Sequence, residues 1–305
     1  MSVVEILLAA MVLDALIGDP DTIWRRISHP AALIGGAIGV LDRHLNQRPA
    51  QKLKGACALL GLVALAAIAG IGIARLPDAG VVELMLVAVL LAQNSLVKHV
   101  GNVARALETG LPEAQKSVAL IVGRDPAGLD HNGVARAAIE SLAENFSDGV
   151  VAPVFWYLLL GLPGLLIYKT VNTADSMIGH RTERYAEFGW AAARVDDVMN
   201  WLPARFSGVL IWLASMQPHA FRTMWNDAGM HRSPNAGWPE AAMAGALGVA
   251  ISGPRVYGGA ATDDPFVNAS GRRDLEPADI DRAVRLTWQS WVGLFGIVTL
   301  IWWIF

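Results

Sequence analysis

The sequence predicts an all-α, polytopic helical integral membrane protein, and three observations support this fold class. Hydrophobic residues make up 54% of the 305 residues and charged residues only 17%, whereas a soluble domain carries about 25% charged residues. The apolar residues are gathered into long blocks. No segment alternates apolar and polar residues as a half-buried strand does. We therefore expect helices that cross a bilayer and no sheet.

Four apolar stretches approach the length of about 20 residues that a helix needs to cross a bilayer core. They are residues 2–18, 55–74, 81–97 and 288–305. The first lacks a basic leading region and a cleavage site, which predicts a retained helix rather than a signal peptide. Trp302 and Trp303 predict an interfacial aromatic anchor in the last.

A fifth apolar stretch, residues 150–168, contains the turn signal Gly161-Leu162-Pro163-Gly164 at its middle. One interpretation is a single kinked span. The other is a re-entrant pair of half-helices, which is tolerated at membrane depth where it lines a cavity. We favour the hairpin, because the densest polar motifs of the chain flank this stretch on both sides.

Two shorter apolar blocks, residues 206–216 and 241–251, are predicted to be tilted helices or buried segments. Small residues dominate the second block, which suits close helix packing. We expect one integrated membrane domain over residues 1–305, with a mainly cytoplasmic, helical insertion at residues 98–149.

Proline and aspartate mark helix starts in the polar parts of the chain. Pro112 and Pro277 stand at first-turn positions, and Asp130 stands where an N-cap is expected. These signals predict amphipathic cytoplasmic helices and a long final helix.

Lys and Arg are unevenly distributed between the connecting segments. Residues 19–54 and 98–149 hold several basic side chains, whereas the link at residues 75–80 holds only Arg75. The basic segments are therefore expected on the cytoplasmic side.

The first polar block covers residues 140–149 and contains Glu140, Glu144 and Asp148 at intervals of four. On one helix these acids share a face. Three adjacent carboxylates repel one another unless a cation lies between them, which indicates magnesium or a basic substrate group. The alternative is a solvated acidic face.

The second polar block covers residues 168–184. Asn172 and Asp175 lie three apart on one helix face and offer oxygen ligands to a hard cation. Arg181 and Arg184 supply donors for phosphate or carboxylate. Helix capping and juxtamembrane charges are the alternative interpretation.

The third polar block covers residues 193–205, where Asp196 and Asn200 lie four apart and Arg194 and Arg205 flank them. Metal or phosphate binding and salt bridging between juxtamembrane helices explain this block equally well. A further loop at residues 231–240 is rich in polar donors.

Several classes of protein are excluded. The net charge of −3 argues against a strongly basic nucleic-acid binder. The single Cys57 cannot form an intrachain disulfide. The histidines show no zinc-ligand spacing, and no phosphate loop, dinucleotide turn or nucleophile elbow is present. A nucleotide site must therefore be built from acids, amides and arginines.

The polar blocks, in this order, resemble the CobD/CbiB family, and the resemblance covers nearly the whole chain. The run at residues 140–149 followed by that at 171–179 is highly specific. The small departures are Pro126 and Ala174, neither at a charged motif position. The matching residues are Gly18-Asp19-Pro20, His29-Pro30, Gly123-Arg124-Asp125, 140–149, Ala152-Pro153, Phe155-Trp156, Tyr168-Lys169, 171–179, Glu183-Arg184-Tyr185, 188–194, Asp196-Asp197, Pro203-Ala204-Arg205 and 233–240.

The resemblance implies adenosylcobinamide-phosphate synthase activity, an amide-forming ligase step of cobalamin biosynthesis. Aminopropanol phosphate would be joined to a propionate of adenosylcobyric acid, with ATP as co-substrate and Mg²⁺ as cofactor. It also implies a multi-pass protein of the bacterial inner membrane with its active site facing the cytoplasm. The partners implied are the two substrates, the lipid bilayer and other enzymes of nucleotide-loop assembly, and no nucleic acid.

The residues are assigned expected roles on this basis. Glu140, Glu144, Asp148 and Asp175 are the expected catalytic acids. The same four, with Asp196 and Asp197, are the expected metal ligands. The expected substrate- and phosphate-binding residues are Asn145, Lys169, Asn172, Ser176, Arg181, Arg184, Arg194, Arg205, His231 and Asn235.

Two other classes remain as alternatives. A transporter would use the hairpin and its acids as a gate, but the chain shows no inverted repeat. A non-catalytic AmpE-like membrane sensor would keep the spans and lose the acids, which are all present here. The sequence leaves open the number of full spans, the oligomeric state, which acids bind metal, the order of substrate binding, and whether the amine donor is phosphorylated.

Overall fold

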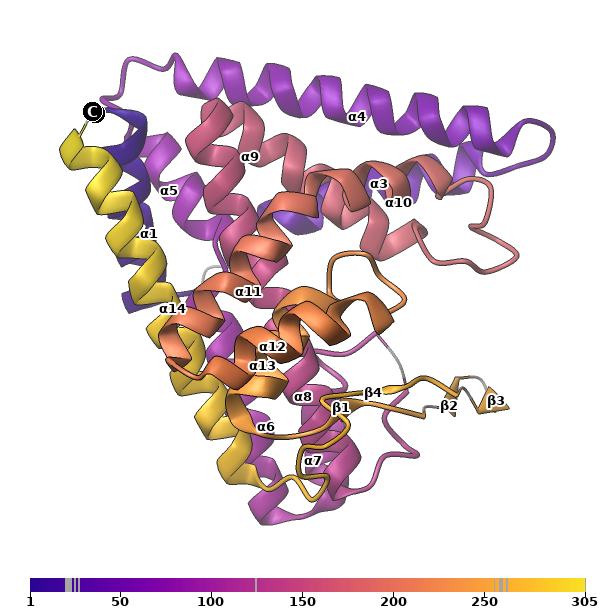
Figure 1. Ribbon diagram of the computed structural model, residues 1–305. Coiled ribbons are helices and arrows are strands. Elements are labelled where there is room, and N and C mark those ends of the chain that lie inside the picture. Colours follow the sequence, from indigo (N-terminus) through magenta and orange to yellow (C-terminus); the bar gives the residue numbers. More distant parts are fainter. Residues whose placement is uncertain are drawn as a thin grey trace. The chain divides into compact units, whose positions relative to one another are not determined.

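The computed structural model describes residues 1–19, 24, 26, 28–123, 125–254, 256–257, 260–261 and 263–304. Pro20 and Arg124, which belong to two of the sequence motifs, lie outside these residues. The all-helical prediction is confirmed (Figure 1). The helices are α1 (Val3–Ile17), α3 (Pro30–Leu45), α4 (Gln51–Ala74), α5 (Val81–Leu90), α6 (Gln93–Thr109), α7 (Leu111–Val118), α8 (His131–Phe146), α9 (Ala152–Ile178), α10 (Trp190–Met199), α11 (Trp201–Ser215), α12 (Pro218–Asp227), α13 (Gly237–Leu247) and α14 (Pro277–Ile304).

Two short helical turns and four short strands complete the described elements. A π-helical turn (Ser147–Val151) joins α8 to α9, and a 3-10 turn (Ala228–Met230) follows α12. The strands β1 (Ile251–Ser252) and β4 (Phe266–Val267) pair antiparallel, as do β2 (Val256–Tyr257) and β3 (Ala260–Ala261). The sequence predicted no strand, because two residues are too few to give an alternating pattern.

The expected helix starts are confirmed. Asp130 caps α8 through a hydrogen bond from the Gly133 amide. Pro112 lies in the first turn of α7, and Pro277 is the first residue of α14. The two prolines suit helix starts, since a residue of the first turn has no helical partner for its N–H and proline has no N–H to donate.

Four helical segments are long and apolar enough to cross a membrane. They are Gln51–Ala74, Val81–Thr109, His131–Ile178 and Pro277–Ile304. The second includes a break at Leu91, whose backbone is extended between α5 and α6. The first stretch predicted from the sequence is helical, but α1 has only 15 residues. At 1.5 Å per residue it is about 22 Å long, which is shorter than a bilayer core of about 30 Å.

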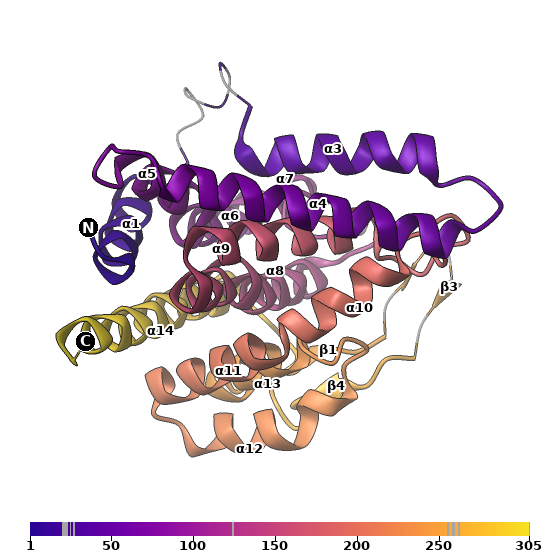
Figure 2. The ribbon, with the colours of Figure 1, turned by 90° about the horizontal axis from the view of Figure 1, so that it is seen from above.

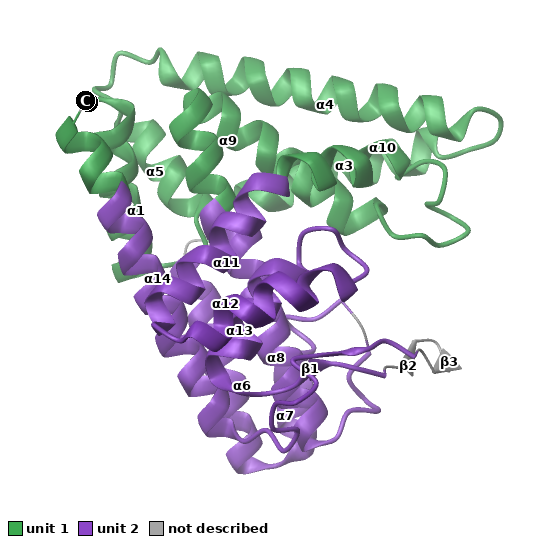
Figure 3. Ribbon diagram, in the orientation of Figure 1, with its two compact units in different colours: residues 1–92, 152–200, 298–305 green, residues 93–151, 201–297 purple. Residues whose placement is uncertain are grey.

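The chain divides into two compact units, each built from segments that are distant in the sequence (Figure 3). Unit 1 contains residues 1–92, 152–200 and 298–305, and unit 2 contains residues 93–151 and 201–297. The insertion predicted at residues 98–149 belongs wholly to unit 2.

Unit 1 is built around α9. This helix packs against α4, α10, α3 and α1, and the views of Figures 1 and 2 agree that α4 lies along it. The fully buried rings of Tyr168 and Phe188 belong to the core. Gly55 permits a close approach, because a Cβ there would lie 1.9 Å from the Phe188 carbonyl oxygen.

The predicted turn in residues 150–168 is present, and α9 is a helical hairpin. Gly161 has φ 64° and ψ −156°, which lies outside the helical region. A Cβ on Gly164 would lie 2.4 Å from the carbonyl oxygen of Trp156, so the chain has folded back on itself. The arms, residues 152–160 and 162–178, are about 14 Å and 26 Å long. The second arm is shorter than a bilayer core of about 30 Å, whereas the first arm continues from α8 through the π-helical turn without a break.

Unit 2 is built around α13, which packs against α8, α11 and α12. Small residues make this packing possible, as the sequence predicted. A Cβ on Gly245 would lie 2.8 Å from the Cα of Ala220, and one on Gly208 would lie 3.0 Å from the Trp238 carbonyl oxygen. The helices of this unit therefore approach one another at backbone distance.

Candidate functional site

Unit 1 holds a group of polar side chains, which we call the carboxylate–amide cluster: the buried Tyr168, Asp196 and Asn200 and the half-buried Asn172 and Asp175. The second arm of α9 supplies Tyr168, Asn172 and Asp175, α10 supplies Asp196, and Asn200 is the C-cap residue of α10. The i, i+3 and i, i+4 spacings place these residues on facing sides of two packed helices. The sequence singled out Asn172, Asp175, Asp196 and Asn200 from these spacings, and the structure brings them together.

Hydrogen bonds order the carboxylate–amide cluster. The side-chain amide of Asn200 donates to Asp196 over 3.0 Å, and the amide of Asn172 donates to the other oxygen of Asp196 over 3.4 Å. The hydroxyl of Tyr168 donates to the Asn200 amide oxygen over 2.9 Å. The two amides thus fix the orientation of one buried carboxylate, as ligand-orienting groups do around metal sites.

Burial and, to a lesser extent, the negative charge of Asp175 raise the pKa of Asp196 to about 7. The hydrogen bonds from Asn200 and Asn172 act in the opposite direction. Two carboxylates that share one buried site disfavour each other's ionisation. A cation between them would remove this cost, and oxygen ligands of this kind suit Mg²⁺.

The position of Asp175 depends on a glycine. A Cβ on Gly179 would lie 1.9 Å from the Asp175 carboxylate oxygen and 2.7 Å from its carbonyl oxygen. The carboxylate therefore occupies the space that a side chain at position 179 would fill. The sequence showed this glycine at the end of the motif, but gave no reason for it.

A pH dependence of stability follows from the raised pKa of Asp196. The folded state binds the proton of the Asp196 carboxyl group more tightly than the unfolded state does. The stabilisation from this protonation is therefore complete below pH 3.8 and is lost as the pH rises through about 7. In metal-free buffer, the Tm of the wild type should rise as the pH is lowered from about 8 to about 5. Asp196→Asn should flatten this dependence. An unchanged pH profile in the variant would contradict the assignment.

The remaining predicted residues of unit 1 surround this cluster in different ways. Asp197 forms an ion pair with Arg194 over 3.1 Å on the surface of α10. Arg184 forms an ion pair with the buried Asp42 of α3 over 2.6 Å. This contact gives Arg184 a structural role, because it neutralises a buried charge. Arg181 and Ser176 are exposed, and Lys169 is half-buried.

The acidic row of unit 2 is not one helical face. The π-helical turn begins at Ser147, so the α-helical phase that aligned Asp148 with Glu140 and Glu144 ends before Asp148. Glu140 is buried and accepts the backbone N–H of Ser252 over 2.6 Å, Glu144 is exposed, and Asp148 is half-buried. In the described part of the chain, no group of three or more His, Cys, Asp or Glu side chains could hold a metal ion. Asn145, also predicted here, is exposed and donates to the Ser141 carbonyl oxygen.

Unit 2 brings together three other predicted residues, Arg205, His231 and Asn235. With Trp201, Trp238 and Glu240 they form a second group, which we call the arginine–tryptophan cluster. The guanidinium of Arg205 lies 4.3 Å from the ring centre of Trp201 and 4.6 Å from that of Trp238. It donates to the Trp201 carbonyl oxygen over 2.6 Å and approaches the Asn235 amide oxygen at 3.4 Å. Two aromatic faces hold a planar cation in a fixed orientation.

A histidine–carboxylate pair completes the arginine–tryptophan cluster. His231 Nε2 lies 3.6 Å from the buried carboxylate of Glu240, and its Nδ1 accepts the backbone N–H of Ser233. Acceptance at Nδ1 leaves the proton on Nε2, facing the carboxylate. The sequence singled out Arg205, His231 and Asn235 separately. It missed Trp238 and Glu240 as their partners, although both belong to the same motif.

The fold and these clusters define a multi-pass helical membrane protein with two groups of polar side chains suited to cations, phosphates and carboxylates. The model of the CobD/CbiB protein family matches residues 7–287, and the chain belongs to this family.

Several relatives match over nearly their full length. The chain is 50% identical to a cobalamin biosynthesis protein CobD of Brucella suis, over 96% of this chain and 95% of the relative. It is 48% identical to that of Sinorhizobium fredii, over 93% and 92%, and 43% identical to that of Rhodobacter capsulatus, over 99% of both chains. No solved structure matches this chain.

Proposed function

We propose that this chain is a membrane enzyme of cobalamin biosynthesis that forms an amide bond at the expense of ATP. It would join aminopropanol phosphate to a propionate carboxylate of adenosylcobyric acid and give adenosylcobinamide phosphate. Membership of the CobD/CbiB family supports the pathway. The observation that carries the proposed chemistry is the carboxylate–amide cluster, in which the buried carboxylate of Asp196 lies close to the half-buried carboxylate of Asp175.

The reaction requires charge stabilisation. A carboxylate is a poor acyl donor, and its activation by ATP brings several negative oxygens together. Magnesium, when bound, offsets such charge on phosphoryl oxygens. Asp175 and Asp196 would hold it, and Asn172 and Asn200 would keep the Asp196 carboxylate in position. Asp197, paired with Arg194, supplies further negative charge nearby.

We assign different roles to the three predicted acids of unit 2. Glu144, which is exposed, and Asp148 remain proposed acid–base or metal-binding groups. Glu140 is a positioning residue, because its carboxylate already accepts the N–H of Ser252.

We propose that the arginine–tryptophan cluster binds a phosphate or carboxylate group of a substrate. Its guanidinium is held between two rings, and a fixed planar donor matches two anionic oxygens at once. Arg181 is an exposed second donor for the same chemistry. The catalytic reaction would take place on the cytoplasmic side, where the basic segments at residues 19–54 and 98–149 are expected.

The geometry of Arg205 yields a test. Arg205→Lys keeps the charge and loses the planar fork and the ring contacts, so KM for aminopropanol phosphate should rise about ten-fold with a smaller change in kcat. Arg285→Lys, an exposed arginine of α14, is the matched control and should behave as the wild type. An unchanged KM in Arg205→Lys would remove this cluster from substrate binding.

Reconstitution with a series of omissions tests the proposed function. Purified full-length protein is incubated with adenosylcobyric acid, aminopropanol phosphate, ATP and Mg²⁺, and the corrinoid is analysed by mass. Omitting ATP or Mg²⁺ should abolish the product. Replacing the amine donor by free aminopropanol identifies which form is used. Product formation without ATP would contradict the proposed activation step.

A transporter remains the second class to separate. Glu83 is a buried acid within a candidate span, a feature common in transport proteins. Its carboxylate accepts the buried hydroxyl of Tyr157 over 2.7 Å, which explains the acid as part of the packing of α5 on α9. Corrinoid uptake into proteoliposomes without any covalent change would favour transport over synthesis.

A further inference from the structure

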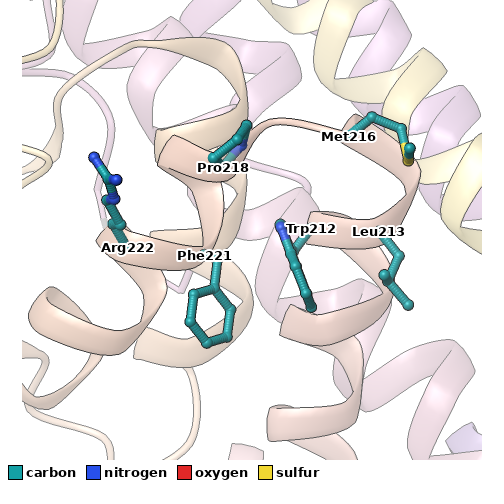
Figure 4. A pocket seen from close by; sticks show the side chains of 6 residues that line it. All are labelled: Trp212, Leu213, Met216, Pro218, Phe221 and Arg222. Carbon is teal, nitrogen blue, oxygen red and sulfur yellow. The ribbon is translucent and has the colours of Figure 1, made fainter.

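A pocket lies where α11 turns into α12 in unit 2 (Figure 4). Its volume is about 350 Å³. Five of its six lining side chains are apolar or aromatic and the sixth is an arginine; they are Trp212, Leu213, Met216, Pro218, Phe221 and Arg222. Figure 4 shows Trp212 and Leu213 on one helix, Phe221 and Arg222 on the next, and Met216 and Pro218 at the connection.

The apolar side chains around this pocket are unusually exposed for their size. Met216 is 81% exposed, Leu213 49% and Phe221 39%, and the adjoining Trp225 is 67% exposed. The aromatic rings form a row, with 4.7 Å between the centres of Trp212 and Phe221 and 6.2 Å between Phe221 and Trp225. An apolar patch of this kind marks a surface that another molecule covers.

Helix α14 indicates how the pocket lies relative to an apolar segment that is long enough to cross a membrane. Within unit 2, Ser215 and Gln217 of the same turn line a neighbouring hollow with Arg285 and Gln289 of α14. Residues 286–304 of α14 carry no charged side chain and span about 28 Å as a helix, close to the thickness of a bilayer core. The turn between α11 and α12 therefore lies at the level where the charged part of α14 ends.

The charge at the pocket is positive. None of its lining side chains is acidic. Within the described part of the chain, the guanidinium of Arg222 makes no hydrogen bond or ion pair. Arg222 also borders a second hollow that contains Asp227, whose carboxylate accepts the backbone N–H of Asn268. An arginine at headgroup level beside an apolar pocket is complementary to a lipid phosphate with its acyl chain.

We propose that this pocket binds one anionic phospholipid, with an acyl chain against Trp212, Leu213 and Phe221 and the phosphate beside Arg222. This inference goes beyond the proposed ligase function and does not depend on it. The bound lipid would fix the α11–α12 turn at the boundary of the bilayer.

Lipid binding by the purified full-length protein tests the proposal. The protein in detergent is titrated with phosphatidylglycerol or phosphatidylcholine, and bound lipid is counted by native mass spectrometry. Arg222→Gln should weaken phosphatidylglycerol binding about five-fold, the effect of one basic side chain at an anionic headgroup layer. Met216→Glu, at an exposed position, should weaken it by at least as much through repulsion. Arg105→Gln, an exposed arginine of α6, should leave it unchanged.

Three results would overturn the proposal. The first is phosphatidylglycerol binding by Arg222→Gln and Met216→Glu that equals the wild type. The second is an equal loss in Arg105→Gln, which would indicate non-specific attraction. The third is a wild-type dimer that Met216→Glu converts to a monomer while lipid binding stays the same, because the pocket would then be covered by a second copy of the chain.

Discussion

Replacing Asp175 by asparagine should lower the rate of adenosylcobinamide phosphate formation by about a hundred-fold or more. The substitution keeps the shape of the side chain and removes one of the two negative charges of the carboxylate–amide cluster. Asp175 contributes to the raised pKa of Asp196, so its loss should bring that pKa closer to its ordinary value. The rate is measured with purified protein at saturating ATP, and the Asp196 titration is followed through the pH dependence of Tm.

The matched control is Asp281→Asn, the same chemical change at an exposed position of α14. It should leave the rate unchanged. If Asp175→Asn keeps the wild-type rate, the carboxylate–amide cluster is structural and the reaction must be assigned to other residues. Asp175→Asn could also be inactive while Mg²⁺ raises its Tm by as much as it raises the Tm of the wild type. Asp175 would then act without binding the metal.

Gly179→Ala should disturb the carboxylate–amide cluster directly. Its Cβ would stand 1.9 Å from the Asp175 carboxylate and 2.7 Å from the Asp175 carbonyl oxygen. The carboxylate can move, but the backbone cannot, so we expect a loss of about 1–3 kcal/mol in the free energy of unfolding. Activity should fall by about a hundred-fold even where the variant is fully folded, because Asp175 loses its position.

Gly61→Ala provides the control for this substitution. Gly61 lies in α4, and a Cβ there would meet no atom within 4 Å. Alanine should be neutral or slightly stabilising at this position, since it lowers the entropy cost of helix formation. Equal effects of the two substitutions on activity would show that Asp175 does not need the space above Gly179.

The sequence was sufficient for the broad fold. Apolar blocks, proline starts and the Gly-Leu-Pro-Gly turn each act locally, and the helices, their N-termini and the hairpin break at Gly161 follow from them. It was less successful with α1, where hydropathy cannot distinguish a 15-residue helix from a full span. The π-helical turn after Phe146 was also missed, because its residues have no distinctive propensity.

The candidate site was predicted only in part, because local sequence patterns do not contain tertiary contacts. Asn172, Asp175, Asp196 and Asn200 were visible as pairs on two helix faces. Their meeting is a tertiary contact between α9 and α10 that no local spacing contains. Glu140 shows the reverse case, because its spacing indicated metal binding, whereas its partner is the backbone of Ser252, 112 residues away.

The partners of Arg205 were missed for a related reason. Trp201 lies one helical turn before it, but Asn235 reaches it from the loop after α12 and Trp238 from the first turn of α13. Aromatic residues are common in an apolar sequence. No sequence pattern therefore distinguishes a ring that stacks on a cation from a ring that packs in the hydrophobic core.

The central claim is that this chain joins an amine to a corrinoid carboxylate. It is tested most directly by following the amine nitrogen with an isotopic label. Wild-type protein is supplied with adenosylcobyric acid, ATP, Mg²⁺ and aminopropanol phosphate labelled at the nitrogen, and the corrinoid is analysed by mass after removal of the protein. The account predicts that the label appears in the corrinoid as an amide, only with ATP present, and that Asp175→Asn incorporates about a hundredth as much or less. Unlabelled corrinoid after incubation with folded wild-type protein and all four components would contradict it.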